Sequence, residues 1–132
     1  VGGTIASCLE RLDSRARELQ HGDFHPEQVV FHNGRVVLID LDRCGAGHPA
    51  LDHGSFLAHA VELDLAAVQR IAFLDEYAAA TGAAVNPAEL AVGYCFGLLR
   101  RCGRPFRDLA PDWPLRVRER IDRLEQAAEG LA

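Results

Sequence analysis

The chain has 132 residues, 48% of them hydrophobic and 25% charged, and a formal net charge of −5. This length is enough for one compact domain with its own core, so we predict a single domain over residues 1–132. No segment approaches the roughly 18 uninterrupted apolar residues of a membrane span, and none has the pattern of a secretory signal. A negative net charge argues against a nucleic-acid partner. We therefore expect a cytoplasmic protein with neither a membrane nor a nucleic acid as its partner.

The four cysteines are scattered and form no CxxC pair, which argues against a disulfide framework or a cysteine-bound metal. They are Cys8, Cys44, Cys95 and Cys102. Half-buried free thiols in a reducing compartment are the favoured interpretation.

The first half of the chain predicts a helix followed by a β-hairpin. Residues 4–20 carry apolar residues at three- and four-residue intervals, which is typical of an amphipathic helix, and this helix is expected to end at His21 and Gly22. Two β-branched runs, residues 29–31 and 36–39, flank Asn33 and Gly34. An Asn-Gly pair between such runs is a strong hairpin signal. Residues 44–49 are expected to form a loop.

The second half of the chain predicts only helices, over residues 51–61, 64–80, 86–102 and 115–129. Asn86 and Pro87 suit a helix cap and first turn, whereas Thr81 and Gly82 suit a helix end. The expected fold class is mainly α, with one small hairpin set among five or so helices. Because a two-stranded hairpin is not stable alone, we expect the helices to pack around it.

The sequence HGDFHPEQ, residues 21–28, carries polar groups that suit phosphoryl transfer. Asp23 could accept the proton of an attacking hydroxyl as a general base, and Gln28 supplies a carboxamide five positions further on. A turn residue with only a structural role is the alternative for Asp23.

A second acidic group follows the predicted hairpin, where Asp40 comes directly after the apolar residues 36–39. Mg²⁺ prefers hard oxygen ligands, and Asp40 at the end of a buried strand suits this role. Asp42 would point to the same side if the strand continued, and it is a candidate additional ligand.

Two motifs in this order resemble a known family. HGDFHPEQV at residues 21–29 and LIDLDRCGAGHPALD at residues 38–52 are similar to the C-terminal lobe of the aminoglycoside phosphotransferase and choline kinase-like proteins, which have the protein-kinase-like (α+β) fold. The resemblance covers residues 19–60, which would hold the catalytic and metal-binding loops. Residues 61–132 would form the helical subdomain on the substrate side.

The resemblance implies roles for individual residues. Asp23 would be the catalytic base, and Asp40 with Gln28 would hold Mg²⁺. His21 and His25 would support the catalytic loop.

Asp52 would open the following helix and tie it back to that loop. Two residues depart from the family pattern: Gln28 stands where an asparagine is usual, and His48 stands where an acid is usual.

The resemblance also implies ATP as co-substrate and a small hydroxyl compound as acceptor. Because the chain begins at Val1 and contains no methionine, we expect it to be part of a longer protein whose N-terminal lobe binds the nucleotide. The fragment alone is expected to be inactive, and it could self-associate through its exposed lobe interface.

Two other function classes stay open. One is a metal-dependent hydrolase in which His21 with His25, or His53 with His59, would bind a metal beside Asp40. The other is a non-catalytic, kinase-like helical module used only for binding.

The acceptor's chemical class is also open, and an aminoglycoside, another antibiotic, an amino alcohol or a sugar would all fit. A cationic acceptor could be received by acids of the later helices, namely Glu62, Asp64, Asp75, Glu76, Glu89, Asp108 and Asp112. A basic run comprises Arg100, Arg101, Arg104 and Arg107. It is interpreted as a helix end followed by a solvated loop, with a phosphate site as the alternative. Trp113 is expected to fill a helix junction.

Overall fold

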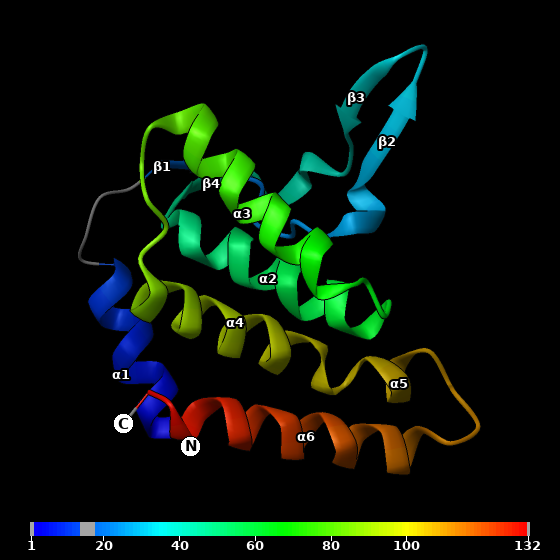
Figure 1. Ribbon diagram of the computed structural model, residues 1–132. Coiled ribbons are helices and arrows are strands. Elements are labelled where there is room, and N and C mark those ends of the chain that lie inside the picture. Colours follow the sequence, from blue (N-terminus) through cyan, green and yellow to red (C-terminus); the bar gives the residue numbers. More distant parts are fainter. Residues whose placement is uncertain (1, 14–17, 132) are drawn as a thin grey trace.

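The computed structural model describes residues 2–13 and 18–131, and this part of the chain is mainly helical with two small antiparallel strand pairs (Figure 1). The helices are α1 (Gly2–Asp13), α2 (Pro49–Glu62), α3 (Ala67–Thr81), α4 (Pro87–Cys102), α5 (Arg104–Arg107) and α6 (Trp113–Glu129). The strands are β1 (Glu18–Gln20), β2 (Val29–His32), β3 (Arg35–Leu38) and β4 (Gly45–Gly47). Two 3₁₀ turns complete the order, η1 (Pro26–Gln28) and η2 (Leu41–Arg43). The expectation of a mainly α chain with a small hairpin is confirmed at this level.

Helix α4 lies at the centre of the molecule, between α2 and α6 (Figure 1). Its contact with α2 is close because glycines face each other across the interface. A Cβ atom on Gly54 would overlap the backbone of Gly93 and Tyr94, and a Cβ on Gly93 would overlap the carbonyl of Ala50. The two helices therefore pack backbone against backbone.

The hydrophobic core is built on the faces of α4. One cluster joins α4 to the helices on both of its sides and to α1, and it consists of Ile5, Ala58, Cys95, Leu98, Leu124 and Ala128. A second cluster joins α1 to α4 through Cys8, Leu12 and Val92. All four cysteines are free; Cys8 and Cys95 are buried in these clusters, whereas Cys44 is exposed.

The predicted first helix is too long. Helix α1 ends at Asp13, and residues 18–20 form β1, which pairs with β4 in the register Glu18↔Gly47 to Gln20↔Gly45. The part of the prediction that falls on residues 14–17 lies outside the described residues. Since β4 occupies residues 45–47, the predicted loop there is partly wrong as well. The motif that begins at His21 thus follows a strand and not a helix.

The predicted hairpin is confirmed, but its surroundings differ from the expectation. β2 and β3 pair from Val29↔Leu38 to His32↔Arg35, and Asn33 and Gly34 both have positive φ angles, of 48° and 72°. This is the geometry of a tight two-residue turn. The hairpin projects away from the helices instead of lying among them (Figure 1).

The apolar side chains of the hairpin are therefore exposed. Phe31 is 78% exposed and Val36 61%, and the strand before Asp40 is not the buried element that its composition predicted. Such a contiguous apolar surface is unusual for a part of a protein that faces solvent on its own.

The later helices follow the prediction within a few residues. The Asn86 side chain accepts hydrogen bonds from the backbone N–H groups of Ala88 and Glu89, so it caps α4 as expected. α3 begins at Ala67, three residues later than predicted, and ends before Gly82. The short helix α5 was not predicted. Among the described residues no helix has the length and apolar character that crossing a membrane requires.

The close approach of α2 and α4 leads to a first prediction. Gly54→Ala should lower the free energy of unfolding by about 1–3 kcal/mol, because the added methyl group must push the backbone of α4 away. Urea unfolding measures this loss. Gly3→Ala is the control, since a Cβ there meets nothing within 4 Å and alanine favours a helix. Equal stability of Gly54→Ala and the unsubstituted protein would contradict the proposed packing.

Candidate functional site

A polar cleft of about 760 Å³ brings the motif residues together. Its lining consists of Asp23, His25, Gln28, Asp40, Arg43, Arg100, Arg101, Arg104, Arg107 and Asp108. Three of the residues singled out from the sequence, Asp23, Gln28 and Asp40, thus face one space. Asp42 and Asp52 are not part of the lining.

The loop that carries Asp23 is held by the carboxylate of Asp52, near the start of α2. The backbone N–H of His21 donates to Oδ2 of Asp52 at 2.6 Å, and that of Gly22 donates to Oδ1 at 3.0 Å. Gly22 has a φ of 80°, and a Cβ there would overlap the carbonyl of Arg43. A glycine is therefore needed at this position, and the tie expected of Asp52 is present.

The side chains of the loop are fixed as well. His21 is buried, and its Nε2 lies 2.8 Å from the carbonyl oxygen of Ile39, which directly precedes Asp40. Phe24 stacks on Phe56 of α2, with ring centroids 5.3 Å apart, and also contacts Phe73 of α3. His21 therefore links the loop of Asp23 to the loop of Asp40.

The hairpin register brings Gln28 next to Asp40. The backbone N–H of Ile39 donates to the carbonyl of Gln28 at 3.1 Å, which continues the strand pairing by one step. The Gln28 side chain is buried, and its Nε2 donates to Oδ2 of Asp40 at 3.0 Å. A carboxamide and a carboxylate thus meet at the base of the hairpin, and both carry the hard oxygen atoms that Mg²⁺ prefers.

Asp40 has a left-handed backbone with a φ of 62° and a ψ of 56°. This conformation is uncommon outside glycine, although aspartate tolerates it better than most residues. It ends the strand, and the 3₁₀ turn η2 follows directly. The premise that Asp42 continues a strand beside Asp40 is therefore wrong, and Asp42 lies exposed on η2.

Two arginines flank Asp23. Arg100, in the last turn of α4, lies 3.0 Å from Oδ1 of Asp23 and also donates to the carbonyl of Gly22 at 2.7 Å. Arg43 lies 3.5 Å from Oδ2 of the same carboxylate. Both ion pairs orient the carboxylate. No local pattern in the sequence indicates the first pair, since 77 positions separate Asp23 from Arg100, whereas Arg43 lies within the second motif.

The basic run faces the cleft. Arg100 and Arg101 lie in the last turn of α4, as expected, but the solvated loop expected after them is wrong. All four of its arginines line the cleft, and two of them belong to the short helix α5. Trp113 does not line the cleft. It packs against Phe106 at 5.0 Å, at the junction of α5 and α6, as predicted.

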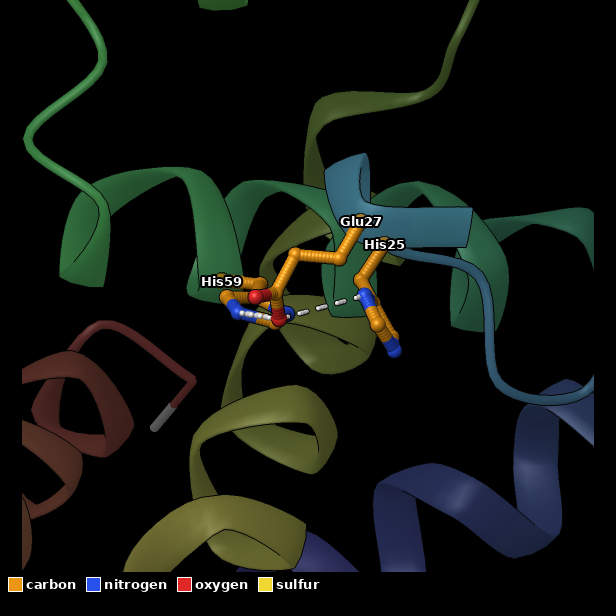
Figure 2. A group of neighbouring side chains, drawn as sticks. All are labelled: His25, Glu27 and His59. Atoms are coloured by element: carbon orange, nitrogen blue, oxygen red, sulfur yellow. Dashed lines mark ion pairs between the residues drawn. The ribbon is translucent and has the colours of Figure 1, made fainter. Parts of the chain in front are cut away.

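His25, Glu27 and His59 form a compact group beside the cleft (Figure 2). Their ligand atoms lie within 4.8 Å of one another, and no other group of three such side chains that could hold a metal ion occurs in the described part of the chain. Neither of the histidine pairs expected for a hydrolase comes together with Asp40. His53, for example, packs against Phe73 and Tyr77.

The hydrogen bonds of His59 argue against a metal in this group. Burial, together with the charge of Arg101, lowers the pKa of the His59 ring from 6.5 to about 4, so the ring is neutral at pH 7. Arg101 lies 3.0 Å from Nδ1 and can only donate, so the proton of the ring sits on Nε2. Nε2 then donates to Glu27 at 3.0 Å. The lone pair that a metal needs is therefore not available.

His48 replaces the acid that is usual at its position, and it acts as a helix cap. Its Nδ1 accepts a hydrogen bond from the backbone N–H of Ala50 at 3.3 Å, and its Nε2 lies 3.7 Å from Glu89. The Nδ1 acceptor of His48 thus does the capping that an acidic side chain would otherwise do.

Of the seven acids proposed to receive a cationic acceptor, only Asp108 lines the cleft. Glu62 is instead bound to Arg101 at 2.6 Å and to Arg120 at 3.1 Å, in a largely buried network that joins α2, α4 and α6. Asp112, directly before α6, pairs with Arg116 in the first turn of that helix.

The tie made by Asp52 leads to a second prediction. Asp52→Asn should lower the free energy of unfolding by about 1–3 kcal/mol. The asparagine NH₂ group replaces one of the two carboxylate oxygens, so either the N–H of His21 or that of Gly22 loses its acceptor. Chemical unfolding measures the loss, with Asp42→Asn, an exposed substitution, as control. A variant as stable as the unsubstituted protein would show that the tie does not hold the loop.

The environment of His59 leads to a third prediction. The unfolded chain binds a proton at this ring below about pH 6.5, whereas the folded chain binds it only near pH 4, so the free energy of unfolding should fall as the pH is lowered between these values. His59→Gln should make this fall smaller. Some of it should remain, because burial also lowers the pKa of His25 and His53. An unchanged slope in unfolding experiments would contradict the assignment to His59.

The comparison with known families agrees with these motifs. The profile of the phosphotransferase enzyme family, APH, matches residues 4–92, which is more than half of the chain. No curated protein and no solved structure matches the chain. The matched segment contains Asp23, Gln28, Asp40 and Asp52, which are the residues that shape or hold the cleft. The chain therefore belongs to the phosphotransferase enzyme family.

Proposed function

We propose that the chain is the C-terminal lobe of a kinase-like phosphotransferase and that the intact protein transfers the γ-phosphoryl group of ATP to a hydroxyl of a small molecule. Residues 19–60 supply the catalytic and metal-binding loops, and residues 61–132 form the substrate side. The observation that carries this proposal is the convergence of Asp23, Gln28 and Asp40 on one cleft. Phosphoryl transfer depends mainly on positioning and charge, and these three side chains supply both.

Asp23 is the base in this proposal. Its carboxylate faces the cleft, and it is held on one side by Arg100 and on the other by Arg43. An acceptor hydroxyl that lies within hydrogen-bonding reach of Asp23 is oriented for attack and transfers its proton to the carboxylate. The bonds from Asp52 to the loop keep this carboxylate in place.

Asp40 and Gln28 are the residues that would hold Mg²⁺. Nε2 of Gln28 donates to Asp40 at 3.0 Å, and a rotation of the amide group would turn its oxygen, the atom that can bind Mg²⁺, toward Asp40. A bound Mg²⁺ would neutralise the charge of the ATP phosphates. The longer side chain of Gln28, compared with the asparagine usual in the family, suits this position because the buried side chain reaches Asp40 from the backbone of η1.

The exposed hairpin supports a nucleotide-binding lobe as the neighbour of this chain. Its apolar residues include Val30, Phe31, Val36 and Val37, and it starts beside Gln28 and Asp40. A lobe packed on this surface would bury the apolar side chains and bring the ATP phosphates to the metal ligands. Catalysis is therefore assigned to the intact protein.

The decisive experiment is an assay of Asp23→Asn in the full-length protein. Turnover with ATP and Mg²⁺ should fall by about 10²–10⁴-fold, because asparagine cannot accept the hydroxyl proton. The melting temperature should stay close to that of the unsubstituted protein. Asp42→Asn, on the exposed turn η2, should keep normal turnover, whereas Asp40→Asn should raise the Mg²⁺ concentration needed for half-maximal activity.

Normal turnover of Asp23→Asn would refute its role as base. An intact protein that shows no transfer, and whose melting temperature responds to neither ATP nor Mg²⁺, would instead be the non-catalytic binding module.

A further inference from the structure

We propose that the hydroxyl acceptor carries an anionic group, a carboxylate or a phosphate, and that Arg104 and Arg107 bind it at the α5 end of the cleft. This inference rests on the proposed function and names the chemical class of its acceptor. It differs from the cationic acceptor that the acids of the later helices suggested.

Arginine is the most frequent residue in the lining of the cleft. Five arginines face it, against the three aspartates Asp23, Asp40 and Asp108. The chain contains no lysine, so every side-chain cation available at neutral pH is a guanidinium. The planar guanidinium can form two parallel hydrogen bonds to one carboxylate or phosphate, which makes it suited to recognise such groups.

Two of the five arginines, Arg100 and Arg101, have carboxylate partners and are mostly buried, with side chains 24% and 13% exposed, so their positions are fixed. Arg100 and Arg43 lie on either side of Asp23, at 3.0 and 3.5 Å. Arg101 is bound to Glu62 and to the ring of His59, and its side chain is only 13% exposed. Arg43 is 63% exposed and its contact with Asp23 is longer, so it is held more loosely, but it belongs to the turn η2 that follows Asp40 and not to α5.

Arg104 and Arg107 remain for a ligand. Arg104 contacts Asp108 at 3.3 Å, one turn further on, and their side chains are 39% and 59% exposed, so this pair is weak and can be exchanged for another anion. Arg107 forms no ion pair with any residue in the part of the chain that the structure describes. The guanidinium groups of Arg104 and Arg107 thus line the cleft and have N–H groups available to bind a ligand.

The short helix α5 holds these two arginines in place. Pro105 is buried, and Phe106 packs edge-on against Trp113 at the start of α6. The backbone N–H of Asp108 also donates to the carbonyl of Arg104 at 2.9 Å. A site built on such an anchored turn loses little freedom when it binds a ligand.

The position of α5 favours the acceptor over the nucleotide as the source of the anionic group. The hairpin, beside which Gln28 and Asp40 lie, projects away from α5 (Figure 1). The ATP phosphates belong on that side, near the metal ligands. Asp23 lines the same cleft and is paired with Arg100 in the last turn of α4, shortly before α5, so a molecule with its hydroxyl at Asp23 can extend its other end toward α5.

The test measures kcat and KM of the full-length protein with ATP and Mg²⁺ for small acceptors of different charge. Glycerate and glycerol 3-phosphate are the anionic probes, glycerol is neutral, and choline and ethanolamine are cationic. We expect kcat/KM to be highest for an anionic probe. Arg104→Gln and Arg107→Gln should each raise its KM by about tenfold with little change in kcat, since each removes a charged hydrogen bond to the acceptor.

Arg116→Gln is the matched control, because Arg116 forms the same kind of exposed pair one turn from Asp112, but on α6 and outside the cleft. It should leave KM unchanged. Calorimetric titration of the same probes without ATP measures binding independently of transfer.

The outcomes separate this inference from the proposed function. Transfer to choline or glycerol without any preference for anionic probes would overturn the inference and leave the phosphotransferase intact. A higher KM for ATP instead of the acceptor in the two variants would also overturn it. Binding of an anionic probe that both variants lose, without transfer to any acceptor, would support the arginine site and count against the proposed function.

Discussion

The site depends on the carboxylate of Asp52. Through two backbone hydrogen bonds it joins the loop of Asp23 to the start of α2, and a charged acceptor makes such bonds stronger than those between neutral groups. The loop is a turn with a positive φ at Gly22 that no sheet or helix would stabilise by itself. Because α2 packs closely on α4, the same bonds also place Asp23 within reach of Arg100. The stacking of Phe24 on Phe56 and the hydrogen bond from Arg100 to the carbonyl of Gly22 add to this tie.

The second half of the site depends on the register of the hairpin. Asn33 and Gly34 make a two-residue turn, so each residue of β2 has one fixed partner in β3, and Gln28 must lie opposite Ile39. That register places the Gln28 carboxamide against Asp40. His21 then connects the two halves, since its ring contacts the carbonyl that precedes Asp40. The loops of the base and of the metal ligands are thus coupled by one buried histidine.

Histidines in this chain have structural tasks more often than chemical ones. His48 caps α2, and His59 links Arg101 to Glu27 of η1, the turn that carries Gln28. His59 can do this because burial keeps it neutral, with one nitrogen accepting and the other donating. A group that looks like a metal site by its residue types is therefore a hydrogen-bonded brace (Figure 2).

The sequence by itself determined the local features: the hairpin at Asn33, the cap at Asn86, the later helices, and the identity of Asp23, Gln28 and Asp40 as candidate site residues. These follow from backbone preferences and short motifs that need no distant partner. The tertiary structure alone decided the pairing of residues 18–20 with β4, the exposure of the hairpin and the position of the arginines of α4 and α5. Each of these depends on contacts between segments far apart in the chain, which no local pattern encodes.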